Sequence, residues 1–265
     1  MAFQFHTNKE KYFNWQYVNS KEAIIPFVEE HCQLNEKTRV LEIGCAEAGV
    51  LKAFVERGCQ CVGVEIAAQR LEYARHFLKE PFESGQISFI SKDIYDIDIE
   101  QEFSSKFDII ILKDVIEHIH DQQKIMAKLQ DYLNPSGLIY MGFPPWQMPF
   151  GGHQQLARNK WLSKLPYYHL LPMPIYKMLL KLGGEQQNKI DNLAEIKETG
   201  ISIEQFEQYA KRTNYNIVSR TLFLIRPIYR FKFGLKIRKQ FAWMVALPYI
   251  RNYFTTGAFY LLKSK

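Results

Sequence analysis

The stretch Val40-Leu41-Glu42-Ile43-Gly44-Cys45-Ala46-Glu47-Ala48-Gly49-Val50-Leu51 decides how this chain folds. It starts as a short apolar run typical of a buried strand, continues as a tight turn of small residues, and ends in a helix predicted over 50–57. The small side chains let a ligand approach the backbone, and the N–H groups of the first helical turn are free to bind it. Glu42 lies where the carboxyl ends of parallel strands open a crevice. The stretch therefore predicts a site for a nucleotide-like ligand.

Strands and helices alternate on both sides of this stretch. The predicted strands are near-continuously apolar and cover residues 40–43, 59–65, 86–90, 107–112 and 138–143, with helices predicted over 67–78 and 122–133. Such alternation is typical of a parallel sheet covered by helices on both faces. Two further strands, over 215–226 and 257–263, complete the pattern. We therefore predict an α/β fold with a doubly wound, mostly parallel, seven-stranded sheet.

The same pattern divides the chain into four parts. Residues 1–36 form an N-terminal helical segment, with Ser20 capping a helix that runs to about Cys32. Residues 37–143 form the ligand-binding core, in which Asn134-Pro135-Ser136-Gly137 predicts a stop and turn before the strand over 138–143. The strand pattern stops in a first insert, 144–200, and returns in 201–265. There a helix over 201–212, with Ser202 and Gln205 as capping partners, precedes the closing hairpin. A second insert, 227–256, interrupts that hairpin.

Charge and composition set further limits. The 265 residues carry a net charge of +6, yet residues 144–184 and 208–265 contain no acid, and the latter segment holds twelve Lys or Arg. These segments are either solvated basic faces or surfaces for an anionic partner such as a phosphate-bearing substrate, a membrane or a nucleic acid. No run of about 18 apolar residues predicts a membrane span, and the N-terminus lacks an apolar leader. We expect a cytoplasmic protein whose four cysteines are reduced.

Acidic residues near the ends of the first three strands, and a signature after the fourth, extend the argument. They are Glu42, Glu65, Asp93 and the segment Asp114-Val115-Ile116-Glu117-His118-Ile119. In this order and spacing the chain resembles the class I S-adenosylmethionine-dependent methyltransferases, and in particular the ubiquinone-pathway O-methyltransferases. The resemblance covers about residues 20–143 and the closing helix and hairpin, and both inserts lie outside it. A glycine-poor turn alone would not distinguish this family from a nicotinamide dehydrogenase.

The resemblance implies a role for each matching residue. The carboxylate of Glu65 would accept both ribose hydroxyls, and Asp93 would accept from the adenine amino group, with the Ile94 backbone beside it and Ile66 on the adenine face. The methionine part of the cofactor and its sulfonium would lie against Glu42, Gly44, Cys45, Ala46, Gly49, Leu112 and Lys113. The family commonly has glycine where this chain has Ala46 and Ala48, so we expect the turn geometry to differ there.

Two histidines follow neighbouring strands and are the candidate catalytic residues. His118 is expected to begin the helix after the fourth strand, and His153 lies in the loop after the fifth. Either could take a proton from an acceptor that arrives protonated. Some hydroxyl-methylating relatives hold a divalent cation at this place, so Asp114, Glu117, His118 and His153 are candidate metal ligands. The metal-free interpretation, in which this segment is only the common family signature, is preferred.

The resemblance thus implies methyl transfer from S-adenosylmethionine to a small or lipid-linked, anionic acceptor, most simply at a hydroxyl oxygen. The first insert is predicted to form a lid over the acceptor, and the basic, aromatic second insert either rims the site or lies peripherally on a membrane. Two alternatives remain open at this point. One is an RNA methyltransferase that uses the basic inserts, and the other is a non-catalytic protein that binds S-adenosylmethionine.

Overall fold

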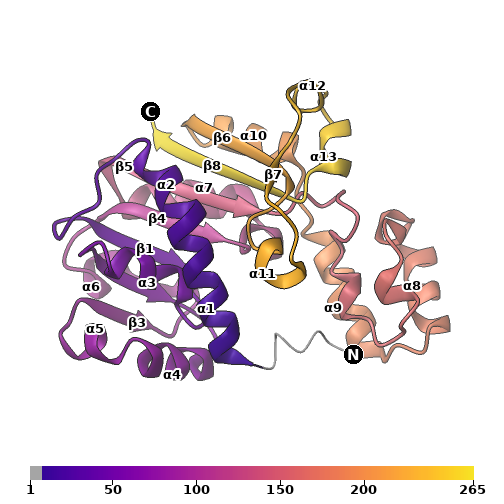
Figure 1. Ribbon diagram of the computed structural model, residues 1–265, viewed down its shortest axis with the longest axis horizontal. Helices are drawn as coiled ribbons and strands as arrows, with labels where there is room; N and C mark the ends of the chain where they lie inside the picture. Colours follow the sequence, from indigo (N-terminus) through magenta and orange to yellow (C-terminus); the bar gives the residue numbers. More distant parts are fainter. Residues whose placement is uncertain (1–7) are drawn as a thin grey trace.

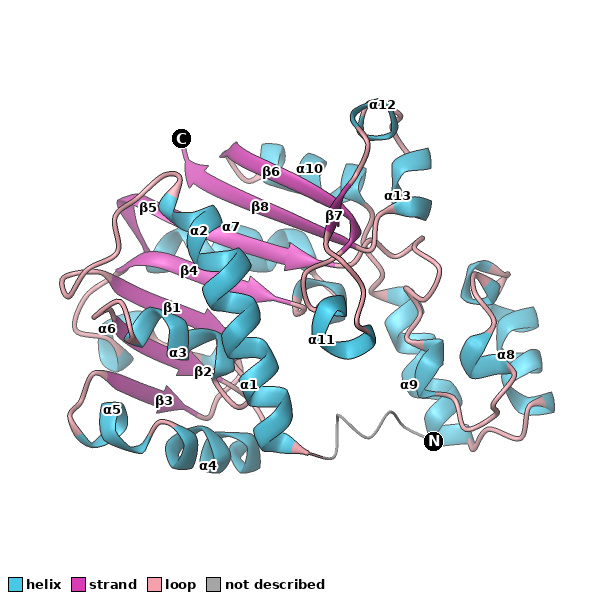
Figure 2. Ribbon diagram, viewed as in Figure 1, coloured by secondary structure: helices cyan, strands magenta, loops and turns pink. Residues whose placement is uncertain are grey.

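The computed structural model describes residues 8–265, so the first part of the predicted N-terminal segment lies outside the described residues. One sheet crosses the molecule in the order β3-β2-β1-β4-β5-β8-β6-β7 (Figures 1 and 2). Its strands are β1 Arg39–Ile43, β2 Gln60–Val64, β3 Ile87–Ile90, β4 Phe107–Lys113, β5 Leu133–Phe143, β6 Tyr215–Ile225, β7 Arg238–Lys239 and β8 Gly257–Ser264. The doubly wound α/β class predicted from the sequence is confirmed.

The first five strands are parallel, and the last three are antiparallel. β1 pairs with β2 and β4, β2 with β3, and β4 with β5, all in parallel, and β8 then pairs antiparallel with both β5 and β6. The prediction of seven strands is wrong by one. The eighth, β7, is two residues long and pairs with the end of β6. A strand this short has no sequence period, and only pairing at the sheet edge defines it.

Helices cover both faces of the sheet (Figure 2). They are α3 Gly49–Val55, α4 Ala68–Phe77, α5 Lys79–Glu83, α6 Ile99–Glu102, α7 Gln122–Tyr132 and α10 Ile203–Arg212, with 3-10 turns η3 Ile94–Asp96 and η4 Ile116–His118. Alternate strand residues enter two cores: Ile110 and Leu112 pack toward α7 and α10, whereas Ile109 and Ile111 pack toward α3 and the N-terminal helices. This explains why the strands read as unbroken apolar runs. The predicted capping of α10 by Ser202 is confirmed, since its side chain accepts from the Gln205 N–H at 3.1 Å.

The N-terminal helix begins earlier than predicted. Instead of starting at a Ser20 cap, it runs as α1 Lys9–Asn19, a π-helical turn η2 Ser20–Ile24 and α2 Ile25–Glu29, with Asn8 as its cap. Ser20 is fully buried inside this helix. The π turn directly precedes Pro26, which cannot donate a backbone hydrogen bond, so the wider turn is a local adjustment to that missing donor.

The predicted break before the fifth strand is a bulge. β5 begins at Leu133, and its pairing with β4 passes from Phe107↔Leu133 directly to Ile109↔Leu138. The turn residues 134–137 are thus accommodated as extra residues within the strand rather than as a loop before it.

The two inserts lie beyond the carboxyl ends of the parallel strands, at the end toward which their arrowheads point (Figure 1). The first contains the 3-10 turns η5 Gln154–Leu156, η6 Leu162–Lys164 and η7 Tyr168–Leu170 and the helices α8 Met173–Leu182 and α9 Gln187–Glu198, which enclose a small core of their own. The second contains α11 Tyr229–Phe233, α12 Ala242–Val245 and α13 Ile250–Phe254. Both inserts therefore stand where a ligand would enter the crevice.

Two sequence expectations concern single features of the fold. All four cysteines are free thiols, and Cys45, Cys59 and Cys61 are buried. Within residues 8–265, no helix has both the length and the apolar character needed to cross a membrane.

Candidate functional site

The turn after β1 takes the shape that glycine usually provides, although two of its residues are alanines. Gly44, Ala46 and Ala48 have φ values of 69°, 52° and 61°. From the sequence we expect the turn geometry to differ at these two positions, but both alanines adopt the left-handed region that glycine favours. Gly44 is required for another reason: a Cβ there would lie 2.6 Å from Val115 Cγ2. The turn is thereby packed against the loop that follows β4.

The N-terminal helix α1 covers this turn, and no pattern in the sequence predicts this contact. A Cβ on Gly49 would lie 2.4 Å from the Phe13 carbonyl oxygen, so the two helices meet backbone to backbone. Lys9 Nζ lies 2.7 Å from Glu47 Oε1, a carboxylate that is only 2% exposed. The resulting pocket is lined by Tyr12, Phe13, Gln16, Glu42, Gly44, Cys45, Ala46, Glu47, Gly49, Val50, Arg70, Lys113 and Asp114. Five of the residues predicted to hold the methionine part of a cofactor, together with Lys113, line one pocket.

Glu65 is held against the turn by backbone donors. Its Oε2 accepts from the Ala46 N–H and its Oε1 from the Ala67 N–H, both at 3.0 Å. Each carboxylate oxygen keeps a second lone pair, and the side chain remains 12% exposed. Glu65 is therefore oriented by the protein while still able to accept two further hydrogen bonds.

Glu42 lies deeper, at the end of β1. Burial raises the pKa of its carboxyl well above the usual range, and the nearby Lys113 charge only partly offsets this. Its Oε2 has no hydrogen-bond partner within the described residues. A buried, unsatisfied carboxyl oxygen at the floor of a pocket is a free acceptor for a ligand N–H.

The other predicted cofactor residues form the rim beside β2 and β3. Asp93 caps the turn η3 by accepting from the Tyr95 N–H at 2.9 Å, and Ile94 is buried. Ile66 stands apart because it is 70% exposed, although it is apolar. An exposed isoleucine next to Glu65 leaves apolar surface open to a flat ligand.

A partly buried ion network joins the end of β4 to the start of the second insert. Asp114 Oδ2 lies 2.6 Å from Lys113 Nζ and 2.8 Å from Arg226 Nη2, and Asp114 Oδ1 also accepts from Arg226 Nη2 at 2.8 Å. Burial alone would raise the pKa of Asp114, but Arg226 and Lys113 hold it far below its usual value. Asp114 is in the left-handed region with φ 55°. Arg226, 112 positions away in sequence, is a site residue that sequence reasoning missed.

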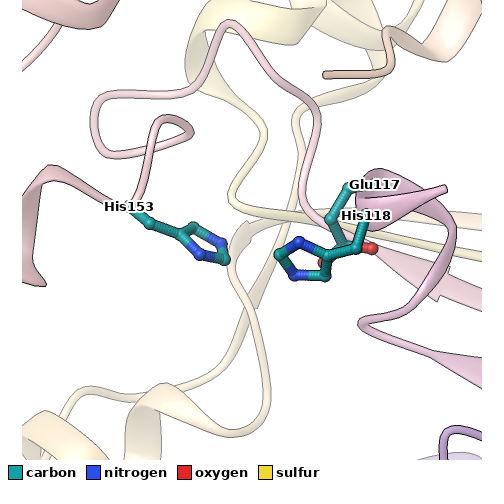
Figure 3. A group of neighbouring side chains, drawn as sticks. All are labelled: Glu117, His118 and His153. Carbon is teal, nitrogen blue, oxygen red and sulfur yellow. The ribbon is translucent and has the colours of Figure 1, made fainter. Parts of the chain in front are cut away.

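Glu117 and His118, which follow β4, come together with His153, which follows β5 (Figure 3). One potential ligand atom from each lies within 4.8 Å of the others, and the two imidazole centroids are 5.1 Å apart. Burial raises the pKa of Glu117 to about 8, with the Asp114 charge adding to it. Burial also lowers the pKa of His118, and burial together with His118 lowers the pKa of His153 to about 4. His153 is therefore uncharged near neutral pH, whereas His118, whose side chain is exposed, has a pKa that is only shifted in the same direction.

The structure brings the two candidate catalytic histidines together. Of the four candidate metal ligands, it groups three and leaves Asp114 apart from them. Asp114 is paired with Arg226 and Lys113 instead of joining the other three, because two cations compete for its carboxylate. His118 ends the short turn η4 rather than beginning a helix, since the next helix starts at Gln122. His153 has φ 52°, an uncommon backbone conformation for a non-glycine residue, and such outliers cluster at functional sites.

Comparison with known proteins gives a consistent result for the core. A family model described as a methyltransferase domain matches residues 16–174, more than half of the chain. A ubiquinone biosynthesis O-methyltransferase from Idiomarina loihiensis is 34% identical over 116 residues, which are 43% of this chain and 45% of that protein. The chain thus matches just under half the length of this curated relative.

Solved structures share the fold at low sequence identity. An S-adenosylmethionine-dependent methyltransferase from Clostridium acetobutylicum aligns with a TM-score of 0.57 and 13% identity, covering 94% of this chain and 92% of that chain. The plantazolicin methyltransferase BamL, solved with a substrate analogue and SAH, aligns with a TM-score of 0.54 and 13% identity, covering 100% and 94%. At these identities the likeness concerns the fold.

Proposed function

This chain belongs to the methyltransferase-domain family, and we propose that it transfers a methyl group from S-adenosylmethionine to a hydroxyl oxygen of a small or lipid-linked acceptor. The observation that carries the proposal is the junction of two sites at the carboxyl ends of the strands. The pocket of the β1 turn adjoins Lys113 and Asp114, and the histidine pair stands just beyond them. The O-methyltransferase relatives favour oxygen as the methylated atom.

S-adenosylmethionine would supply an activated methyl group on its sulfonium. Glu42, Gly44, Cys45, Ala46 and Gly49 would hold its methionine part, where the unpartnered Glu42 Oε2 suits an ammonium donor. Glu65 would accept the ribose hydroxyls, and Ile66, Asp93 and Ile94 would hold the adenine. Leu112 and Lys113 would lie beneath the sulfonium. These residues fit the group because the pocket offers acceptors to its donors and apolar surface to its base.

The transfer needs alignment and a place for one proton. The acceptor oxygen attacks the methyl carbon in line with sulfur, the C–O bond forms as the C–S bond breaks, and the hydroxyl proton passes to an imidazole nitrogen. His118 is exposed and His153 is half-buried, and both have a pKa below the ordinary histidine value, so either imidazole would accept the proton. The first insert, 144–200, would act as a lid, since it carries His153 and excludes water from the reacting atoms.

An anionic group on the acceptor would complement the charge of this region. Lys113, Arg226 and Lys232 lie around one carboxylate, Asp114. Burial lowers the pKa of Lys232 to about 8, and the neighbouring Arg226 charge adds to this effect. A second small pocket, lined in part by Asn19, Lys113, Asp114 and Arg226, continues from the first. Both amide atoms of Asn19 are buried without a partner there, so they are available to a polar acceptor group.

A divalent cation is a second possibility at one point of this site. Glu117, His118 and His153 offer one carboxylate oxygen and two imidazole nitrogens that converge, and Glu117 Oε2 is buried without a partner. Such a donor set fits a divalent transition metal, which would lower the pKa of a bound hydroxyl. Loss of activity on chelation, restored by one added metal, would favour it, and full activity after exhaustive chelation would exclude it.

The direct experiment is an acceptor screen. The purified full chain is incubated with S-adenosylmethionine and a panel of catechols, phenolic acids, quinols, sugars, amines, thiols and short RNAs, and release of S-adenosylhomocysteine is measured. The proposal expects turnover with a hydroxyl-bearing, anionic small molecule or its lipid-linked form. Turnover confined to RNA, or to amines and thiols, would contradict it. Cofactor binding without turnover on any acceptor would favour the non-catalytic alternative.

A further inference from the structure

The two inserts expose far more large apolar surface than the rest of the molecule. Among the described residues, nineteen large apolar side chains are exposed, of which five lie in 144–200 and ten in 227–256. Within the two inserts the most exposed are Trp161 at 86%, Leu182 at 77%, Tyr249 at 71% and Trp243 at 62%. Large apolar side chains gathered in this way mark an interaction surface rather than ordinary scattered exposure.

Unpaired cations stand among these apolar side chains. The exposed basic residues without an ion pair in the described chain are Arg158, Lys160, Lys164 and Lys181 in the first insert and Lys236, Arg238 and Lys239 in the second. Acids that approach the second insert are bound by Arg226, Arg230 and Arg251. The first insert also carries exposed acids, Asp191, Glu195 and Glu198, and all three lie on α9. Outside α9, the inserts therefore present apolar groups and positive charge together.

The two inserts form one end of the molecule. Tyr167 of the first donates its hydroxyl hydrogen to the Tyr253 carbonyl oxygen of the second at 3.0 Å, and the two rings are 6.5 Å apart. Both inserts stand beyond the carboxyl ends of the parallel strands, as does the candidate site (Figure 1). We call the exposed apolar and basic residues of 144–200 and 227–256 the insert face.

We propose that the insert face docks on an anionic lipid bilayer. A bilayer satisfies both of its features, since tryptophan and leucine side chains enter the interfacial region while Lys and Arg contact headgroup phosphates. A nucleic acid would satisfy the cations but leave most of the aliphatic side chains in water. The crevice opens at this same end, so an acceptor embedded in the bilayer would reach it without crossing solvent. The docking itself rests on the surface alone and does not depend on the proposed reaction.

Vesicle sedimentation of the full chain tests this proposal. Vesicles of phosphatidylcholine alone are compared with vesicles containing phosphatidylglycerol, at low and at high salt. We expect binding to the anionic vesicles, weakened by salt. Lys236→Glu with Lys239→Glu should weaken it at least tenfold, since each basic residue near the surface contributes about fivefold. Trp161→Ser with Trp243→Ser should weaken it on anionic vesicles even at low salt.

Matched controls keep the outcome interpretable. Lys37→Glu, and Tyr73→Ser with Phe82→Ser, change exposed residues of the same kinds on the core and should leave vesicle binding intact. Binding of S-adenosylhomocysteine verifies that each variant is folded. Its absence in the wild-type chain would count against the proposed function and would leave the result of vesicle binding unaffected. Three results would overturn the proposal. The first is no sedimentation of the wild-type chain with anionic vesicles, and the second is an equal loss of vesicle binding in the control variants. The third is a dimer that buries the insert face and is dissociated by Trp243→Ser, with no binding of the chain to vesicles.

Discussion

The cofactor half and the acceptor half of the crevice are built in opposite ways. In the cofactor half, Glu42, the β1 turn and Glu65 lie within 24 positions of one another and are fixed by backbone hydrogen bonds. In the acceptor half, Asp114, His153 and Arg226 come from three distant segments and are fixed by side-chain ion pairs and burial. Local pattern therefore specifies the first half, whereas tertiary packing specifies the second, and substitutions should distinguish them.

The largest effect is expected from the histidine pair. His153→Ala removes a candidate proton acceptor of the acceptor half and should lower kcat by about 10²–10⁴-fold while cofactor affinity stays within a factor of about three. Single-turnover kinetics with an identified acceptor and calorimetry with S-adenosylhomocysteine measure the two quantities. His120→Ala, at an exposed histidine nearby, is the control. An unchanged kcat in both His153→Ala and His118→Ala would remove the pair from the mechanism.

Acidic pH should weaken the first insert through His169. This fully buried ring pairs with Gln154 Nε2 at 2.8 Å and with the Trp146 carbonyl oxygen at 2.9 Å, and burial lowers its pKa to about 4. The unfolded chain, with an ordinary pKa near 6.5, binds the proton more readily, so stability is complete above about pH 6.5 and is lost as the pH falls toward 4. The loss from this group amounts to up to about 3 kcal/mol. Denaturant titrations of His169→Gln should show a shallower pH slope than wild type, and the exposed His120→Gln should not.

Breaking the ion network should destabilise the acceptor half. Arg226→Met leaves Lys113 as the remaining ion-pair partner of Asp114 among the described residues, and we expect the free energy of unfolding to fall by about 2–3 kcal/mol. This is below the range for a fully buried pair because Asp114 is 28% exposed. Asp114→Asn with Arg226→Met should recover part of the loss, because no charge is then left uncompensated. Urea denaturation of the two variants measures this, and a double variant less stable than Arg226→Met alone would contradict the pairing.

In the cofactor half, Glu65→Ala removes a charged acceptor and should weaken binding of S-adenosylmethionine by about 1.5–3 kcal/mol. Calorimetry measures the change. The matched control is Glu72→Ala on α4, whose carboxylate is 71% exposed and pairs only locally with Arg75. Unchanged affinity in Glu65→Ala would place the ribose elsewhere.

The smallest effect concerns the two alanines of the turn. Replacing Ala46 by glycine relieves about 1–2 kcal/mol of strain in the left-handed conformation. Glycine also makes the unfolded chain more flexible, which costs about 0.5–1 kcal/mol on folding, so stability should rise by up to about 1 kcal/mol. At Ala48 the fully buried methyl contributes about 0.8 kcal/mol more, which cancels the gain. Thermal unfolding should therefore show a higher melting temperature for Ala46→Gly than for Ala48→Gly. A loss of stability in Ala46→Gly would contradict the presence of strain at this residue.

The sequence predicts what neighbouring residues determine and misses what distant residues determine. Three correct predictions rest on local features. They are the apolar runs of β1 and β4, the position of the turn between β1 and α3, and the Ser202 cap. The two-residue strand β7, the cover of α1 over Gly49 and the Asp114–Arg226 pair depend on contacts between distant segments. No spacing in the sequence signals them. His118 and His153 were found because both follow strands that are neighbours in the predicted sheet.

The central claim is that the β1 turn, Glu65 and Asp93 form a site for S-adenosylmethionine. Isothermal titration of the full chain with S-adenosylmethionine, and in parallel with NAD, tests it most directly. The structure predicts one molecule of S-adenosylmethionine bound per chain and no heat from NAD. Absence of binding at millimolar S-adenosylmethionine, or saturable binding of NAD in its place, would contradict the claim.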